Sequence, residues 1–81
     1  MMPSLTHAGY VGLRTTLYER YTEKIGYGPV LFDVGVRTNP RTRNLIVALR
    51  MYDDRVITSS ELDSTDAALR FVDSIAALEK E

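Results

Sequence analysis

The sequence has no cysteine and only one histidine, His7, among its 81 residues. Without cysteine there is no disulfide, no thiolate metal site and no thiol nucleophile, and this usage fits a reducing compartment. No apolar run approaches the roughly 18–20 residues needed to cross a bilayer, and the amino terminus lacks the charged-then-apolar pattern of a signal peptide. We therefore expect a cytoplasmic protein that does not interact with a membrane.

Residues arranged for catalysis or cofactor binding are also missing. His7 lies at or before the start of a predicted helix, where nothing fixes its geometry. Asp53-Asp54, with Glu61 and Asp63 nearby, lacks the alternating oxygen ligands around a glycine turn that a calcium loop needs. Gly26-Tyr27-Gly28 follows a helix and precedes a strand, which is the reverse of the order in phosphate-binding loops. We expect no metal, no cofactor and no enzymatic activity.

Length and composition restrict the chain to one small domain. Hydrophobic residues make up 44% of the sequence, which is typical of globular proteins and not of disordered ones. A domain of this size buries only about 60–65% of the surface that its unfolded chain exposes. We expect a single, modestly stable domain over residues 1–81, with residues 1–5 loose.

Charge is unevenly distributed although the net charge is only −1. Residues 37–55 carry five arginines against two aspartates, whereas residues 56–81 carry two cations against six acids. Eight of the ten cations are arginines, which suit specific contacts with carboxylates or phosphates. The middle of the chain is thus basic and its carboxyl end acidic.

The first helix is predicted by apolar residues spaced by three or four, at Tyr10, Leu13, Leu17, Tyr21 and Ile25. Two glycines in its first turns each cost about 1 kcal/mol relative to alanine. Thr16 and Glu19 form a capping-box pattern. The helix therefore ends at about residue 25 and begins either near Thr6 or near Thr15.

From residue 30 the apolar period changes to two, which predicts strands. Val30, Phe32, Val34 and Val36 would form the buried face of the first strand, and Leu45, Val47, Leu49 and Met51 that of the second. Residues 38–43 have the composition and length of a hairpin loop. Asp53-Asp54 would form a two-residue turn into a short third strand over residues 55–59.

The last helix has the strongest signal. Asp63, Ser64 and Thr65 are good N-caps, and the apolar stripe that follows is Ala68, Phe71, Val72, Ile75 and Leu78. The order is therefore α-β-β-β-α. We expect an α+β fold in which both helices pack on one face of a three-stranded antiparallel sheet.

The other face of this sheet is predicted to carry Leu31, Ile46, Ala48, Tyr52 and Ile57, with Asp33, Arg37, Arg50 and Arg55 among them. A solvated sheet face is normally polar, so this face is too apolar to be left in water. An apolar patch rimmed by charge is typical of a protein interface. The candidate partner-binding residues are Leu31, Arg37, Arg41, Arg43, Ile46, Arg50, Tyr52, Arg55 and Ile57.

The order of elements resembles the double-stranded RNA-binding domain over residues 10–80. The first helix ends at Gly26, a loop with proline and arginine joins strands one and two, and Asp66-Ala67-Ala68-Leu69 begins an alanine-rich last helix. That family contacts RNA through its first helix, this loop and a lysine cluster that opens the last helix. Asn39-Pro40-Arg41 stands where the family has Gly-Pro-x-His, and Asp63-Ser64-Thr65-Asp66 replaces the lysines. The resemblance supports the topology, argues against duplex RNA binding and implies contacts with protein.

The sequence thus predicts a non-catalytic protein-binding module, an adaptor or inhibitor. It would act through the exposed sheet face and an arginine-rich β-hairpin, on another protein or on a second copy of the chain. A second interpretation is nucleic-acid binding, to duplex RNA or DNA, through Arg37, Arg41, Arg43 and Arg55. A third is an inhibitor of host nucleic-acid machinery carried by a phage or mobile element, whose acidic last helix imitates a phosphate backbone.

Overall fold

The computed structural model describes residues 6–28 and 30–80, so the expectation for residues 1–5 lies outside it. The elements are α1 (His7–Ile25), β1 (Leu31–Thr38), β2 (Leu45–Met51), β3 (Val56–Thr58) and α2 (Thr65–Lys80). The strands form one antiparallel sheet in the order β1-β2-β3. The predicted order of elements is confirmed.

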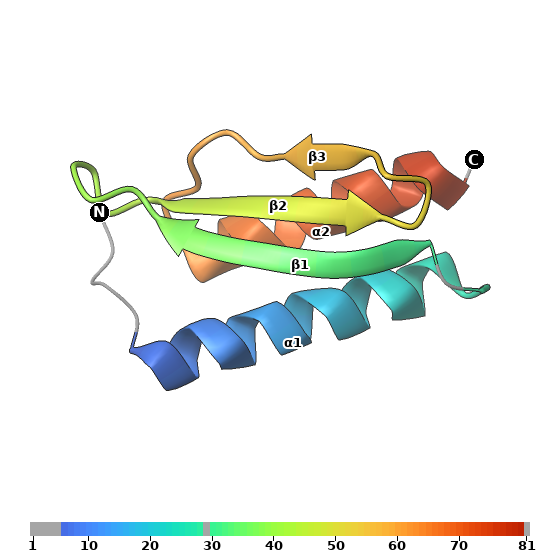
Figure 1. Cartoon of the computed structure of the whole chain (residues 1–81), viewed down its shortest axis with the longest axis horizontal. Coiled ribbons are helices and arrows are strands. Elements are labelled where there is room, and N and C mark those ends of the chain that lie inside the picture. Colours follow the sequence, from blue (N-terminus) through green and yellow to red (C-terminus); the bar gives the residue numbers. More distant parts are fainter. Residues whose placement is uncertain (1–5, 29, 81) are drawn as a thin grey trace.

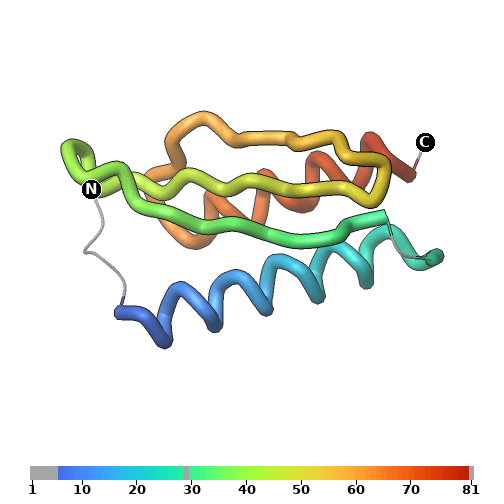
Figure 2. The backbone as a smooth tube through the Cα atoms, viewed as in Figure 1, coloured from blue at the N-terminus to red at the C-terminus, as the bar shows by residue number. Residues whose placement is uncertain are grey.

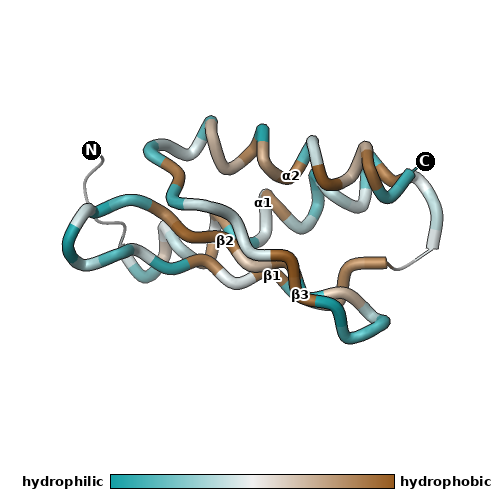
Figure 3. Tube along the Cα trace, turned by 90° about the horizontal axis from the view of Figure 1, so that it is seen from above, coloured by the Kyte–Doolittle hydropathy of each residue, from teal (hydrophilic) through white to brown (hydrophobic). Residues whose placement is uncertain are grey.

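Both helices lie on the same side of the sheet, and the predicted fold class is confirmed. Helix α2 runs behind β2, and α1 runs beside β1 (Figure 1). Viewed from above, the strands overlap one another and α2 runs along one side of them (Figure 3). This α-β-β-β-α arrangement with a small antiparallel sheet is compatible with the topology of the double-stranded RNA-binding domain.

Helix α1 begins at the earlier of the two expected positions. The Thr6 hydroxyl accepts a hydrogen bond from the Gly9 N–H at 3.1 Å, so Thr6 is the N-cap and His7 the first helical residue. The capping box at Thr16 is therefore wrong, because that hydroxyl donates to a carbonyl one turn earlier. Gly26 ends the helix in the left-handed conformation, with φ 72°.

The core lies between the sheet and the two helices. Its buried residues are Leu17, Tyr21, Ile25, Leu31, Val34, Val47, Leu49, Met51, Ala68, Val72 and Ala76. Small residues contribute two of the three buried positions of α2, which lets α2 approach its neighbours closely. Phe71 and Ile75 pack at the margin of the core as predicted, but Leu78 is 66% exposed and does not belong to the buried stripe.

A β-bulge in β1 reverses part of the predicted strand pattern. The register shifts between Leu31 and Asp33, so two consecutive side chains, those of Phe32 and Asp33, lie on the same side of the sheet. Leu31 is fully buried and Phe32 is 49% exposed. The expectation that Phe32 lies in the core and Leu31 on the open face is therefore wrong, because one extra residue exchanges the two faces of a strand.

Helix α1 covers the free edge of β1. Arg14 donates from Nε to the Val34 carbonyl at 2.8 Å and from Nη2 to Asp33 Oδ1 at 3.2 Å. Farther along the same edge, the Tyr10 hydroxyl is hydrogen-bonded to the Thr38 hydroxyl. These contacts occupy backbone and side-chain groups that an edge strand otherwise offers to another chain.

The connections after β2 differ in detail from the predicted ones. The turn has three residues, not two, because the Met51 N–H donates to the Arg55 carbonyl at 2.9 Å. Asp54 occupies the left-handed position of this turn, with φ 71°. β3 is two residues shorter than expected, and α2 is capped by the Ser64 hydroxyl, which accepts from the Ala67 N–H at 3.1 Å.

The bulge makes a direct prediction for two adjacent residues. Leu31→Ala is expected to lower the free energy of unfolding by about 2–5 kcal/mol, because it leaves a cavity in the core. Phe32→Ala is expected to cost clearly less, because Phe32 is 49% exposed and its removal leaves no cavity in the core. Its ring contact with Tyr52 contributes about 0.5–1.5 kcal/mol of that cost. Urea denaturation of the two variants measures both; equal or reversed costs contradict the register described here.

Burial predicts late ionisation of one tyrosine. Desolvation, with a smaller contribution from Glu79, raises the pKa of Tyr21 to about 12. The native state then holds the phenol proton longer than the unfolded chain, whose tyrosines titrate near 10. Stability should be unaffected by this group below pH ~10 and fall as the pH rises toward 12. Tyrosinate absorbance should show a late step that Tyr21→Phe removes; a curve unchanged by this substitution contradicts the prediction.

Candidate functional site: the outer sheet face and the arginine hairpin

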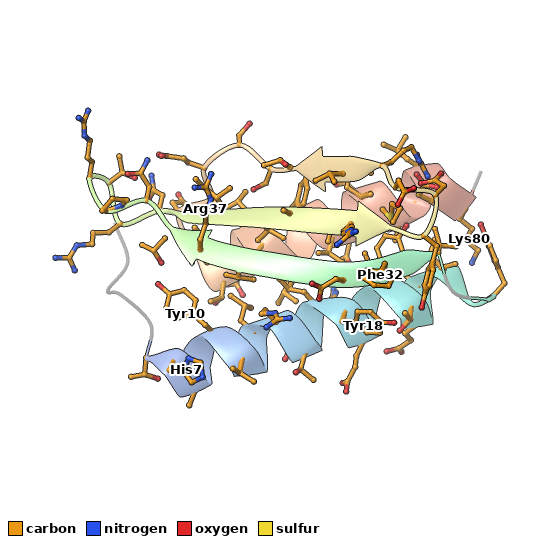
Figure 4. The ribbon with its side chains drawn as sticks, viewed as in Figure 1. His7, Tyr10, Tyr18, Phe32, Arg37 and Lys80 are labelled. Carbon is orange, nitrogen blue, oxygen red and sulfur yellow. The ribbon has the colours of Figure 1, made fainter. Side chains whose placement is uncertain are left out.

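We call the side of the sheet turned away from the helices the outer face. The register gives it three cross-strand rows, Asp33–Arg50–Val56, Gly35–Ala48–Thr58 and Arg37–Ile46, to which Phe32 and Tyr52 are added at one end. Phe32 and Arg37 lie near opposite ends of β1, on the side that faces the reader in Figure 4. The outer face therefore has an aromatic end and a basic end.

The aromatic corner comprises Phe32, Arg50, Tyr52 and Val56. The Tyr52 ring meets Phe32 edge to face, with centroids 5.3 Å apart and planes at 87°, and the Arg50 guanidinium lies 5.0 Å from the Phe32 ring centre. Contacts of these kinds hold side chains in place by about 0.5–1 kcal/mol each at exposed sites. Tyr52 and Val56 nevertheless remain 55% and 60% exposed. The corner is thus an ordered apolar surface with a cation at its centre.

The middle of the outer face is flat because its side chains are short. Gly35 lies opposite Ala48, and Ala48 opposite Thr58. A Cβ placed on Gly35 would lie 3.9 Å from the Ala48 Cβ, which is ordinary contact, and the Gly35 backbone is not left-handed. The fold therefore does not require glycine here. The middle of the outer face therefore carries only small side chains, between the aromatic corner and the basic end.

The arginine hairpin, residues 37–44, forms the basic end. The Asn39 N–H donates to the Asn44 carbonyl at 2.8 Å and the Arg43 N–H to the Asn39 carbonyl at 2.8 Å, which closes a four-residue loop over residues 40–43. Arg37 and Arg41 are exposed, and Arg43 adopts a left-handed backbone with φ 65°. The loop projects beyond the sheet, at the opposite end from the β2–β3 turn (Figure 2).

Glu61, in the segment between β3 and α2, holds this loop in place. Its carboxylate accepts from Asn44 Nδ2 at 3.2 Å, from the Thr42 hydroxyl at 3.1 Å and from Asn39 Nδ2. These bonds, that from Asn44 first, hold the pKa of the Glu61 carboxyl below its ordinary value. Next to it, Leu45 and Leu62 exchange two backbone hydrogen bonds of 2.8 Å. Glu61 therefore fixes the loop against the segment between β3 and α2. The sequence analysis considered Glu61 only as an acid near Asp53-Asp54 and did not predict this role.

Arg55 is exposed, but its guanidinium is bonded to acids of the same chain. Its guanidinium contacts both carboxylate oxygens of Glu79, at 2.8 and 3.0 Å, and its Nε contacts Asp53 at 2.7 Å. Bonds to Glu79 and then Asp53 raise the Arg55 pKa, and bonds from Arg55 lower the pKa of Asp53. This residue joins the β2–β3 turn to the end of α2, so its expected place in the binding surface is not supported.

Two further predicted site residues, Leu31 and Ile57, lie on the core side of the sheet and not on the outer face. Leu31 lies in the core for the reason given above. Ile57 is opposite Leu49 and packs against the core, so Val56 takes its expected place on the outer face. Val56 and Ile57 are adjacent and both apolar, so the alternation in a three-residue strand does not show which of them faces the core. Arg37, Ile46, Arg50 and Tyr52 lie where they were predicted.

A groove between α1 and β1 continues from the outer face. It has a volume of about 480 Å³ and is lined by Val11, Arg14, Thr15, Tyr18, Glu19, Asp33 and Val34. Asp33 belongs to both surfaces, and Tyr18 lies between the helix and the strand (Figure 4). The Arg14–Asp33 ion pair crosses the groove, with both side chains about half exposed.

Two of the carboxylates that the sequence groups together, and one on α2, make structural contacts. Asp53 and Glu61 bind Arg55 and the arginine hairpin as described, and Asp73 of α2 accepts from Arg20 of α1 at 2.7 and 2.8 Å. The bonds from Arg20 lower the pKa of Asp73. Across residues 6–28 and 30–80, no three histidine, cysteine, aspartate or glutamate side chains are grouped so that they could hold a metal ion.

Comparison with known proteins gives no further identification. The chain matches no protein-family model, no curated protein and no solved structure at a significant level. Neither of the two described helices has the combination of length and apolar character required to cross a membrane.

The bonds to Glu61 predict how the hairpin responds to acid. Because its native pKa is lowered, ionised Glu61 contributes stability that is present above its unfolded pKa and is lost as the pH falls through the native one. A carboxyl-carbon NMR titration should therefore show Glu61 protonating below its ordinary range, together with shifts of the Asn39 and Asn44 side-chain amides. An unshifted titration contradicts this arrangement.

Proposed function

We propose that this chain is a non-catalytic protein-binding module that acts through the outer face and the arginine hairpin. The observation that carries the proposal is the aromatic corner, where half-exposed Phe32, Tyr52 and Val56 surround Arg50 on a sheet face that neither described helix covers. Tyrosine, phenylalanine and arginine are the side chains enriched in protein interfaces.

The charges of this surface indicate the chemistry of the partner. Arg37, Arg41 and Arg50 are exposed on it, and the acid in its cross-strand rows, Asp33, is paired with Arg14. Two copies meeting face to face would bring like charges together, which is unfavourable. We therefore favour another protein, an acidic surface with an apolar side chain for the aromatic corner, over a second copy of the chain. Such a module would serve as an adaptor or an inhibitor.

The resemblance to the double-stranded RNA-binding domain fits this proposal. At the start of α2, where that family carries its lysines, the chain has Asp63, the capping Ser64, and Asp66 in the first helical turn. Carboxylates there oppose a phosphate backbone. The topology without the basic cluster supports contacts with protein and not with duplex RNA.

Nucleic-acid binding through the hairpin arginines is the second candidate, and the exposure of Arg37 and Arg41 favours it. The structure gives it less support than the sequence does, because one of its four arginines, Arg55, is bonded to Asp53 and Glu79. The inhibitor whose last helix imitates a phosphate backbone is weakened by the same kind of contact, since Asp73 is paired with Arg20. Binding to phosphates would fall steeply as salt rises.

The proposal can be tested with one variant in the aromatic corner and a matched control variant on α2. Val56→Asp places a charge in the aromatic corner, whereas Leu78→Asp places the same charge on an equally exposed site of α2. Affinity capture from a nuclease-treated lysate of the source organism should yield a discrete protein with the wild-type chain and with Leu78→Asp. Val56→Asp should reduce its recovery by at least about tenfold, as expected at the centre of an interface.

The other outcomes separate the alternatives. Equal recovery with both variants would show that the outer face is not the binding surface. If recovery disappears with nuclease, or falls steeply as the salt concentration rises, the hairpin arginines bind the phosphate backbone of a nucleic acid and not a protein. Circular dichroism of each variant verifies that it is folded.

A further inference from the structure

The loop that carries Arg41 has no apolar anchor of its own. Residues 40–43 are all exposed, so hydrogen bonds take the place of buried apolar contacts in holding this segment. Arg43 also has a left-handed backbone, φ 65°, which is unfavourable for a residue with a Cβ atom. A loop of this kind relaxes into many conformations unless the surrounding structure holds it.

On the amino-terminal side of Arg41, one hydrogen bond orients the next. Asn39 Nδ2 donates to Glu61, and this directs the other end of the amide, Oδ1, toward the Arg41 N–H, which donates to it at 2.9 Å. An asparagine amide has one donor end and one acceptor end, so a carboxylate that takes the donor end fixes which way the acceptor points. The backbone at Arg41 is thus held by Glu61 through Asn39.

The same carboxylate holds the carboxyl-terminal side. The Thr42 hydroxyl donates to Glu61 Oε2 at 3.1 Å, and the same oxygen of Thr42 accepts from the Asn44 N–H at 3.3 Å. Asn44 Nδ2 donates to Glu61 Oε2 at 3.2 Å. Glu61 therefore binds residues on both sides of Arg41 while leaving the arginine itself exposed.

We propose that Glu61 is a positioning residue of the binding surface, which orders the arginine hairpin in advance so that Arg41 meets carboxylates of the partner at little entropic cost. This inference rests on the proposed function and adds a role for a residue that does not touch the partner. It also makes a prediction opposite in sign to simple electrostatics. Removing a carboxylate near arginines should strengthen their attraction for acids, whereas removing a positioning residue should weaken binding.

The first experiment needs no partner. Backbone NMR relaxation of the free chain compares wild type, Glu61→Ala and Glu23→Ala, which removes the same charge from an exposed site on α1. Order parameters of the backbone amides of residues 41–43 should fall from about 0.85 to below about 0.6 in Glu61→Ala only. Order that persists in Glu61→Ala overturns the proposal.

The second experiment measures binding of a short polyglutamate peptide to the full chain by NMR titration. Glu61→Ala should bind the peptide about threefold to tenfold more weakly than wild type, and Glu23→Ala should bind it no more weakly. In a double-mutant cycle, Glu61→Ala should have little further effect once Arg41→Ala is present, because the positioned side chain is gone.

The results distinguish this inference from the proposed function. If the peptide binds the wild type but Glu61→Ala binds equally or more tightly, or if the two substitutions are additive, Glu61 is not a positioning residue and the binding surface stands. If the wild type does not bind the peptide, or binds a short RNA duplex in its place, the acidic protein partner is wrong and the role of Glu61 fails with it.

Discussion

The extra residue in β1 determines what both sides of the sheet carry. With the bulge between Leu31 and Asp33, leucine completes the core and phenylalanine turns outward to meet Tyr52 and Arg50. The same bulge puts Asp33 beside Phe32 on the outer face, within reach of Arg14. Without it, strand alternation would bury the phenylalanine and expose the leucine. The aromatic corner and the ion pair that crosses the groove thus depend on one local backbone irregularity.

Five of the eight arginines fall into two groups by their contacts. Arg14, Arg20 and Arg55 are bonded to acids or to backbone carbonyls, and each joins elements far apart in the chain. Arg37 and Arg41 extend from exposed sites at the basic end. Exposed ion pairs contribute little individually, but these three fix the position of α1 against β1, α1 against α2 and the β2–β3 turn against α2. Arg14, Arg20 and Arg55 therefore connect elements of the fold, whereas Arg37 and Arg41 remain exposed at the basic end.

Much of the fold could be predicted from the sequence because its signals are local. The apolar spacing of α1, the glycine cap at Gly26 and the N-caps before α2 each depend on residues within a few positions of one another. The faces of β1 and β3 could not be assigned, since Leu31 and Phe32, and likewise Val56 and Ile57, are apolar pairs that satisfy either alternation. A bulge is decided by packing across the whole sheet.

The site was less predictable for a related reason. Arg37, Ile46, Arg50 and Tyr52 were placed correctly because they follow the regular register of β2 and the end of β1. The sequence predicted Arg55 to be a partner-binding residue, because it does not show that Glu79, 24 residues away, binds its guanidinium. Glu61 was missed because three donors from another loop converge on it, and such long-range hydrogen bonds leave no periodic pattern. The amino-acid composition indicates neither the Arg55–Glu79 pair nor the hydrogen bonds to Glu61.

The protected edge of β1 has a consequence for how this chain can assemble with others. A sheet grows from one molecule to the next when a bare strand edge is long enough to pair. Here Arg14 and Tyr10 occupy one edge, and β3 at the other edge is three residues long. Helix α1 thus partly covers the edge of β1, and the edge that β3 offers is short. Pairing of a foreign strand at these two edges is therefore less favourable than pairing at a long, bare edge.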